Sequence, residues 1–193
     1  MFIELTDHLR CTRPHDEQFL VLLPGEMRGR LVWSGELGCP VCGRVVRVED
    51  GVADFGGGTP ADASTALAPE AIQALLGIQG PGGYVALIGS ATTAAPGLAA
   101  LLPGVRFVLV NPARNTPDSE AGSVVRAGVL PVKRASMRGV VVGSDAAADP
   151  RWVGSALGAA LGGLRVVAEG EPPGRDDCEV LAAAPGVWVG KRR

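Results

Sequence analysis

The sequence predicts an α/β protein in which a small metal-stapled N-terminal module precedes a mostly parallel sheet that ends in a hairpin. Three observations lead to this prediction. Cysteine and histidine residues are spaced as metal ligands before residue 43. From residue 69 onward, uninterrupted Val, Leu and Ile runs alternate with helix-compatible segments, which is typical of a parallel sheet covered on both faces. A short Pro-Gly turn joins the last two runs, as in a hairpin.

The candidate metal ligands are Cys11, His15, Cys39 and Cys42. They form two closely spaced pairs, called the first knuckle (Cys11 and His15) and the second knuckle (Cys39 and Cys42) here. Paired thiolate and imidazole ligands of this kind predict a tetrahedral zinc site. Four protein ligands close the coordination shell, so the predicted zinc is structural and has no open position for a substrate. Two alternatives stay open. His8 could replace His15, although it lies close to Cys11, and the cysteines could be a redox pair or buried free thiols.

The segment after the second knuckle carries a recognisable pattern. Residues 44–48, RVVRV, alternate as in a strand, whereas a thioredoxin-type motif would open a helix. Residues 37–55, LGCPVCGRVVRVEDGVADF, resemble zinc-ribbon proteins that bind and activate RNA and protein methyltransferases. The resemblance covers residues 1–55 and implies a zinc-ribbon domain that binds a protein partner. It departs at the first knuckle, where that family commonly has a second Cys-x-x-Cys.

A composition change marks a domain boundary after the ribbon. Residues 56–64 are rich in Gly, Pro and small polar residues, which predict a flexible linker over 56–68 between a domain at 1–55 and a second at 69–193. The second domain opens with a predicted helix over 69–77, where Pro69 stands at the first helical position and Gly77 closes the helix.

The remaining elements follow in alternation. Another helix is expected near 97–102, and Asp149-Pro150 predicts the N-cap and first turn of a helix that runs to about 161. The expected strands cover residues 83–89, 105–110, 123–126, 139–143 and 164–168, followed by a hairpin of 178–182 and 187–191.

This order of elements resembles the class I S-adenosylmethionine-dependent methyltransferases over residues 69–193, and it implies a Rossmann-like fold. The landmarks of the resemblance are Gly89 after the first strand, Pro103-Gly104 before the second, Leu130-Pro131-Val132, Ser136–Val142 and Leu161–Val167.

The resemblance also implies where S-adenosylmethionine would bind, namely Gly89, Ser90 and Asn111. The family's Gly-x-Gly-x-Gly loop is reduced to Gly89 and the residues SATTA. Asn111 stands where an acidic residue accepts the ribose hydroxyls, and an amide makes weaker bonds there than a carboxylate. Residues 126–129, directly before Leu130, lack the family's acidic residue, and Arg138 replaces a further aspartate. We therefore expect a pseudo-enzyme, a protein with a methyltransferase-like fold that has lost its cofactor grip.

No other catalytic set is apparent. No histidine follows His15, and no serine lies in a nucleophile-elbow pattern. Asp145 is the best remaining cleft candidate, although a loop aspartate before a helix explains it more simply. Trp152 and Trp188 are expected to be core or interface anchors, and Cys178 is expected to be a core residue.

Whole-chain properties bound the function. The 193 residues carry a net charge of −2 and are 47% hydrophobic, which indicates a soluble globular protein with no membrane span and no signal peptide. Scattered basic residues do not indicate nucleic-acid binding. We expect a cytoplasmic interaction or scaffold protein whose partner is an active methyltransferase or a second copy of itself. The alternative is a working methyltransferase with a divergent cofactor loop.

Overall fold

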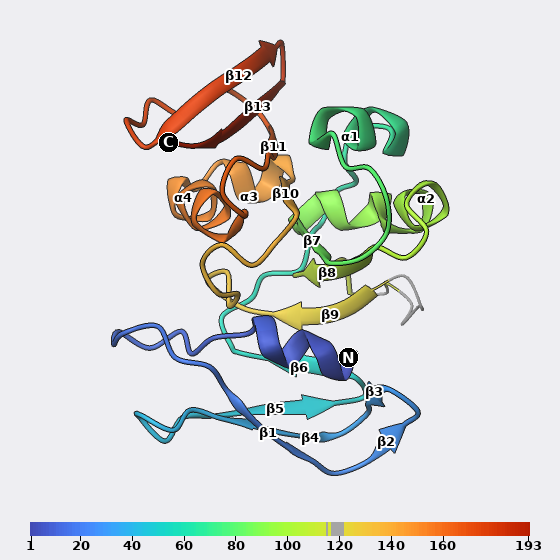
Figure 1. Ribbon diagram of the computed structural model, residues 1–193, viewed down its shortest axis with the longest axis vertical. Helices are drawn as coiled ribbons and strands as arrows, with labels where there is room; N and C mark the ends of the chain where they lie inside the picture. Colours follow the sequence, from blue (N-terminus) through green and yellow to red (C-terminus); the bar gives the residue numbers. More distant parts are fainter. Residues whose placement is uncertain (115, 117–121) are drawn as a thin grey trace.

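The computed structural model describes residues 1–114, 116 and 122–193. In these residues eleven strands form one mixed sheet in the order β1-β4-β5-β6-β9-β8-β7-β10-β11-β13-β12, beside a small β2–β3 ribbon. The strands follow one another along the long axis of the molecule, from β1, β4 and β5 at the bottom of Figure 1 to β12 and β13 at the top. The chain is therefore a mixed α/β protein.

The centre of the sheet is parallel. The five strands there, in spatial order, are β9 (Gly122–Arg126), β8 (Arg106–Val110), β7 (Tyr84–Ile88), β10 (Gly139–Val142) and β11 (Val166–Glu169). All five strands were predicted, and each is buried over nearly its whole length. Continuous Val, Leu and Ile runs form such strands because both of their faces are covered.

Helices cover both faces of the parallel strands. The predicted α1 (Pro69–Leu76) and α2 (Ala95–Leu101) lie on one side in Figure 1, and α3 (Ser144–Ala147) and α4 (Pro150–Ala159) lie on the other. Helix α1 ends at Gly77 in the left-handed conformation, and the Asp149 carboxylate caps α4 by accepting the Arg151 N–H. The short α3 carries no helical signal of its own and was not predicted.

The predicted terminal hairpin is present as β12 (Cys178–Ala184) and β13 (Val187–Arg192). Strand β13 pairs antiparallel with β11 and so lies between β11 and β12. Trp188 and Cys178 are buried, as expected for core residues.

The N-terminal part extends the same sheet. Its elements are η1 (Ile3–His8), β1 (Val21–Pro24), β2 (Met27–Arg28), β3 (Leu31–Val32), β4 (Gly35–Gly38), β5 (Val45–Glu49) and β6 (Val52–Asp54). Strand β6 pairs in parallel with β9, so the sheet continues from the predicted first domain into the second. One apolar cluster includes Leu5, Leu37 and Phe55 together with Ala86 and Ile88 of β7, and the two parts therefore share a core.

Residues 56–68, called the strap here, run along the carboxyl edge of the parallel strands. The Ala61 N–H donates to the Asn111 carbonyl (3.1 Å). Further along, the Thr65 hydroxyl and the Ala66 N–H donate to the Glu169 carboxylate at 2.9 and 2.7 Å. The segment predicted as a linker is thus hydrogen-bonded to the ends of β8 and β11.

No helix in the described part of the chain combines the length and the apolar character that a bilayer crossing requires.

Candidate metal centre and sheet-edge crevice

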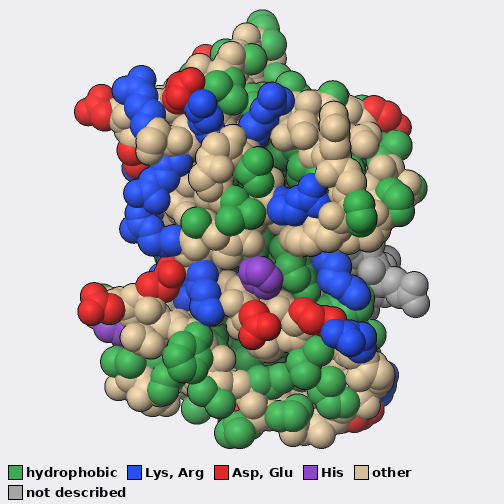
Figure 2. All heavy atoms as spheres, viewed as in Figure 1, with side chains coloured by type: hydrophobic (Ala, Val, Ile, Leu, Met, Phe, Trp, Pro, Cys, Tyr) green, Lys and Arg blue, Asp and Glu red, His purple; other side chains and the backbone are tan. Residues whose placement is uncertain are grey.

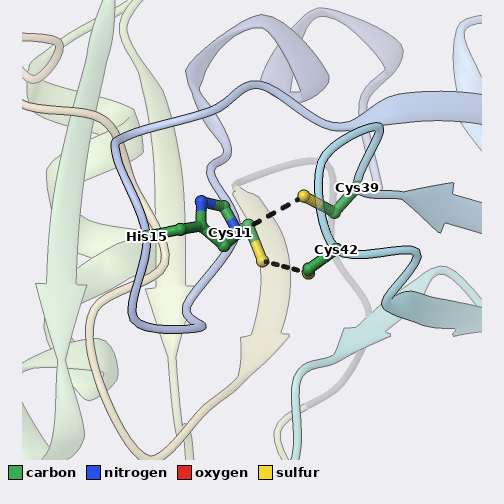
Figure 3. A group of neighbouring side chains, drawn as sticks. All are labelled: Cys11, His15, Cys39 and Cys42. Atoms are coloured by element: carbon green, nitrogen blue, oxygen red, sulfur yellow. Dashed lines mark hydrogen bonds between the residues drawn. The ribbon is translucent and has the colours of Figure 1, made fainter.

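The four predicted metal ligands lie together. The ligand atoms of Cys11, His15, Cys39 and Cys42 all lie within 4.8 Å of one another, although 23 residues separate the two pairs in sequence. Figure 3 shows Cys11 and His15 facing Cys39 and Cys42 across a small gap. These residues can hold a metal ion.

Two interatomic distances test whether one tetrahedral ion fits. Cys11 Sγ and Cys42 Sγ are 3.7 Å apart, and Cys39 Sγ and His15 Nε2 are 3.5 Å apart. Bonds of about 2.3 Å to sulfur and about 2.05 Å to nitrogen at tetrahedral angles place two sulfurs about 3.8 Å apart and a sulfur and a nitrogen about 3.6 Å apart. These two distances are therefore close to the edges of a tetrahedral thiolate and imidazole site.

The orientation of His15 is set by its own backbone neighbour. Nδ1 lies 2.7 Å from the Asp16 carbonyl oxygen, which can only accept, so Nδ1 carries the proton and Nε2 keeps its lone pair toward the thiols. His8, the alternative ligand, is not in the cluster. Its ring lies 4.8 Å from that of Tyr84, and burial lowers the pKa of His8.

The second knuckle favours a thiolate at Cys39. Burial by itself raises the pKa of this thiol, but the backbone N–H groups of Cys42 and Val41 point at its sulfur, and the pKa falls to about 6. Gly43 has a φ of 68°, which permits the tight turn that aims these N–H groups. Cys11 differs, since burial raises its pKa. One ligand is therefore prepared to bind a cation near neutral pH.

A second candidate site, called the crevice here, lies at the carboxyl ends of β7, β8, β9 and β10. It is a cavity of about 420 Å³. In parallel sheets, ligands bind at this edge where the strand order reverses, which here is between β7 and β10. The strap forms one wall, the strand ends form the floor, and α3 and α4 form the other wall. The lining residues are Gly57, Thr59, Pro60, Asp62, Ala63, Ile88, Gly89, Asn111, Ala127, Gly128, Asp145, Ala146, Asp149, Arg151 and Trp152.

Two of the three predicted cofactor residues, Gly89 and Asn111, line the crevice. Gly89 has a φ of 62°, and a Cβ there would lie 2.6 Å from Asp145 Oδ2, so the turn after β7 requires glycine. Ser90 is fully buried. Its N–H donates to Asp145 (2.9 Å), and its hydroxyl faces Glu169 (3.4 Å). Asp145 thus both holds this turn and faces the crevice.

The Asn111 side chain is engaged with the backbone. Its Nδ2 donates to the Ala127 carbonyl (2.8 Å), and its Oδ1 accepts the Ala127 N–H (2.9 Å). Asn111 is 6% exposed, and its φ of 53° places it in the left-handed region. A Cβ on Gly58 would lie 2.7 Å from the Ala127 nitrogen, so only glycine lets the strap approach this pair. The amide ties the end of β8 to the end of β9 beneath the strap.

Sequence reasoning missed two residues that organise these sites. Glu169, at the end of β11, is 5% exposed and also accepts the Ser144 N–H (2.9 Å) that begins α3. Arg44, directly after the second knuckle, donates to Thr12 Oγ1 and to the Phe55 carbonyl. The sequence offered one signal for each residue. Glu169 is an acid at the end of an apolar strand, and Arg44 directly follows a Cys-x-x-Cys-Gly turn.

No protein-family model matches the chain, and no curated protein resembles it in sequence closely enough to count as a relative. The functional argument therefore rests on the residues of this chain.

Proposed function

We propose that this protein is a non-catalytic, zinc-binding interaction protein in which a zinc-ribbon module is joined to a degenerate methyltransferase-like unit. It acts by binding another protein and not by chemistry, in a reducing compartment such as the cytoplasm. The observation that carries the proposal is the engagement of Asn111 in two backbone hydrogen bonds beneath the strap.

Zinc is the metal that the N-terminal cluster favours. Three sulfurs and one imidazole nitrogen are soft and borderline ligands, and their spacing matches a tetrahedral ion. Four protein ligands leave no position for a substrate, so the role is structural. Metal analysis of the purified protein tests this assignment. The wild-type protein is expected to contain one equivalent of zinc, and the Cys39→Ser, Cys42→Ser variant is expected to contain none. A metal-free wild-type protein under reducing conditions would refute the assignment.

The strand order supports the methyltransferase-like assignment. The third, second, first, fourth and fifth parallel strands stand side by side in that order, as in doubly wound dinucleotide-binding sheets. The crevice lies at the point where such sheets bind their ligands. This likeness concerns the arrangement of strands, and function depends on the residues of the site.

The residues at the crevice argue against a bound S-adenosylmethionine. The position expected to accept ribose hydroxyls is Asn111, whose polar atoms both bind Ala127. Arg138, which replaces another family aspartate, points its guanidinium at the carbonyls of the loop before β7, including those of Gln79 (2.9 Å) and Pro81 (2.9 Å). Asn111 therefore has no free polar atom for a ribose, whereas Arg138 precedes β10 at the opposite edge of the sheet and does not line the crevice.

Exposed apolar side chains support a protein partner. Phe19, Val21 and Leu23 are 52%, 45% and 62% exposed and alternate along the outer edge of the sheet at β1. Hydrophobic side chains gather at this lower end of the molecule (Figure 2). The other edge of the N-terminal module, β6, already pairs with β9 of the same chain. Within the N-terminal module, β1 is therefore the edge available to the partner, an active methyltransferase or a second copy.

Calorimetric titration of S-adenosylmethionine and S-adenosylhomocysteine into zinc-loaded protein tests the loss of cofactor binding. Concentrations that detect dissociation constants up to about 1 mM are needed, which corresponds to about −4 kcal/mol. No heat of binding at two temperatures is expected. Micromolar binding would overturn the proposal.

The second candidate is a methyltransferase with a divergent cofactor loop. The observation that favours it is the crevice itself, since a volume of about 420 Å³ falls within the size range of small-molecule sites. Gly89 and Asn111 would then contact the cofactor from the ends of β7 and β8, with Ser90 supporting the loop behind them. Micromolar binding in the titration would select this candidate.

A further inference from the structure

The residue that connects the metal cluster to the crevice is Arg44. Its guanidinium donates to Thr12 Oγ1, next to the ligand Cys11, and to the Phe55 carbonyl, at the start of the strap. Its own carbonyl accepts the N–H of the ligand Cys39 (2.8 Å). Arg44 therefore joins both knuckles to the residue that precedes the strap.

The path continues from Phe55 to the crevice wall. The Phe55 N–H donates to the Arg126 carbonyl (2.7 Å), and the Gly128 N–H donates to the Gly56 carbonyl (2.9 Å). Gly57 and Gly128 line the crevice, and Gly58 packs against the Asn111 amide. Each step is a hydrogen bond or a close backbone contact, so the position of Phe55 sets the position of the strap.

We infer that Arg44 is a positioning residue that couples metal binding at the two knuckles to the seating of the strap over the crevice. The inference rests on the proposed metal site and is independent of whether S-adenosylmethionine binds. A guanidinium can hold two separate acceptors at fixed angles, whereas an ammonium is a single point charge. Arg44→Lys therefore keeps the charge and removes the bridge.

Coupling of this kind is reciprocal, so a change in the strap must alter metal affinity. Gly58→Ala is the natural perturbation, since the added methyl would lie 2.7 Å from the Ala127 nitrogen and displace the strap. Gly162→Ala is the matched control, because a Cβ at Gly162 meets no atom within 4 Å. Arg47→Lys is the control for Arg44, because Arg47 is an exposed arginine on β5.

The test is a double-mutant cycle on zinc affinity in the full-length chain, measured by competition with a chromogenic chelator. Gly58→Ala is expected to weaken zinc binding about five-fold or more in the wild-type background. In the Arg44→Lys background the same change is expected to have less than about a two-fold effect, because the bridge is already absent. Both controls should keep wild-type affinity.

The outcomes distinguish a failure of the coupling from a failure of the metal site. Equal effects of Gly58→Ala in both backgrounds, or no effect in either, overturn the coupling and leave the metal site intact. A wild-type protein that binds no zinc overturns both. If Gly58→Ala does not fold, Thr65→Val replaces it, since it removes one of the two hydrogen bonds that hold the other end of the strap to Glu169. Amide exchange in zinc-loaded protein gives a second readout, in which Arg44→Lys should raise exchange at Gly128 and Ala61 and leave β7 unchanged.

Discussion

The N-terminal module and the parallel sheet differ in how their strands are held. The burial of β5 alternates between exposed and buried residues, whereas every residue of β7 is buried. A strand with one covered face contributes about half the apolar burial of a strand with two, and hydrophobic stabilisation scales with that area. The module carries a candidate metal cluster, formed by residues before β1 and between β4 and β5, whereas the parallel sheet has helices on both sides. One end of the sheet thus has a candidate metal site, whereas its centre is held by packing on both faces.

The sharpest way to break this comparison is to remove the metal. The Cys39→Ser, Cys42→Ser variant is expected to lose amide protection in β1, β4 and β5, while β7 and β10 stay protected by the second apolar cluster, which includes Val85, Leu87 and Val141. Zinc affinity should also fall as the pH drops below about 6, where the Cys39 thiol takes up a proton. Hydrogen exchange resolved along the chain provides the measurement. A single transition for all strands would show that the two regions form one cooperative unit.

Asn111 tests the parallel sheet, where a buried polar side chain lies within the packed region. Asn111→Ala leaves the Ala127 N–H and carbonyl without partners in a buried place, and the free energy of unfolding should fall by about 1–3 kcal/mol. Asn111→Asp should also destabilise, because a carboxylate oxygen would face the Ala127 carbonyl.

Denaturant unfolding of both variants provides the measurement. Asn111→Asp with unchanged stability and stronger binding of S-adenosylmethionine would instead favour the methyltransferase candidate.

The strap lies between the two regions and is held at its far end by Glu169. Glu169→Gln keeps the shape but replaces one acceptor oxygen with a donor, which faces either the donors of Thr65 and Ala66 or the Ser144 N–H. We expect a loss of about 1–2 kcal/mol from these charge-assisted bonds. Limited proteolysis within the strap should accelerate together with this loss. Glu171→Gln, a change two residues beyond β11, serves as the control, and equal proteolysis of both variants would contradict the assigned role.

Local patterns in the sequence were enough to predict the elements and the ligands. Knuckle spacing identified Cys11, His15, Cys39 and Cys42, and alternating apolar runs identified the five parallel strands and α1, α2 and α4. The domain boundary at 56–68 and the zinc-ribbon and methyltransferase resemblances stay predictions. Placing β6 beside β9, by contrast, depends on which strand edges meet in space, and β6 and β9 are separated by 67 residues, from 55 to 121.

The strap shows, at the level of single residues, that local sequence patterns cannot predict contacts between distant parts of the chain. Gly, Pro and small polar residues at 56–64 are as compatible with a flexible joint as with a segment that must approach a backbone closely. Gly58 is needed because Asn111 and Ala127 occupy the space of its missing side chain. That reason involves residues more than 50 positions away in the sequence, so no local pattern contains it.

The smallest expected effect concerns the apolar edge at β1. Leu23→Ser changes a side chain that is 62% exposed, so the free energy of unfolding of the isolated chain should change by less than about 0.5 kcal/mol. Because β1 has a neighbour on one side only, the same change should weaken a complex that uses this edge. Light scattering of the purified protein measures association with a second copy, and pull-down with active methyltransferases measures binding to the other proposed partner. Glu36→Gln, on the adjacent β4, controls for a change of surface polarity. If Leu23→Ser destabilises the isolated chain by several kcal/mol, the residue belongs to the core of the module, and the partner must bind elsewhere.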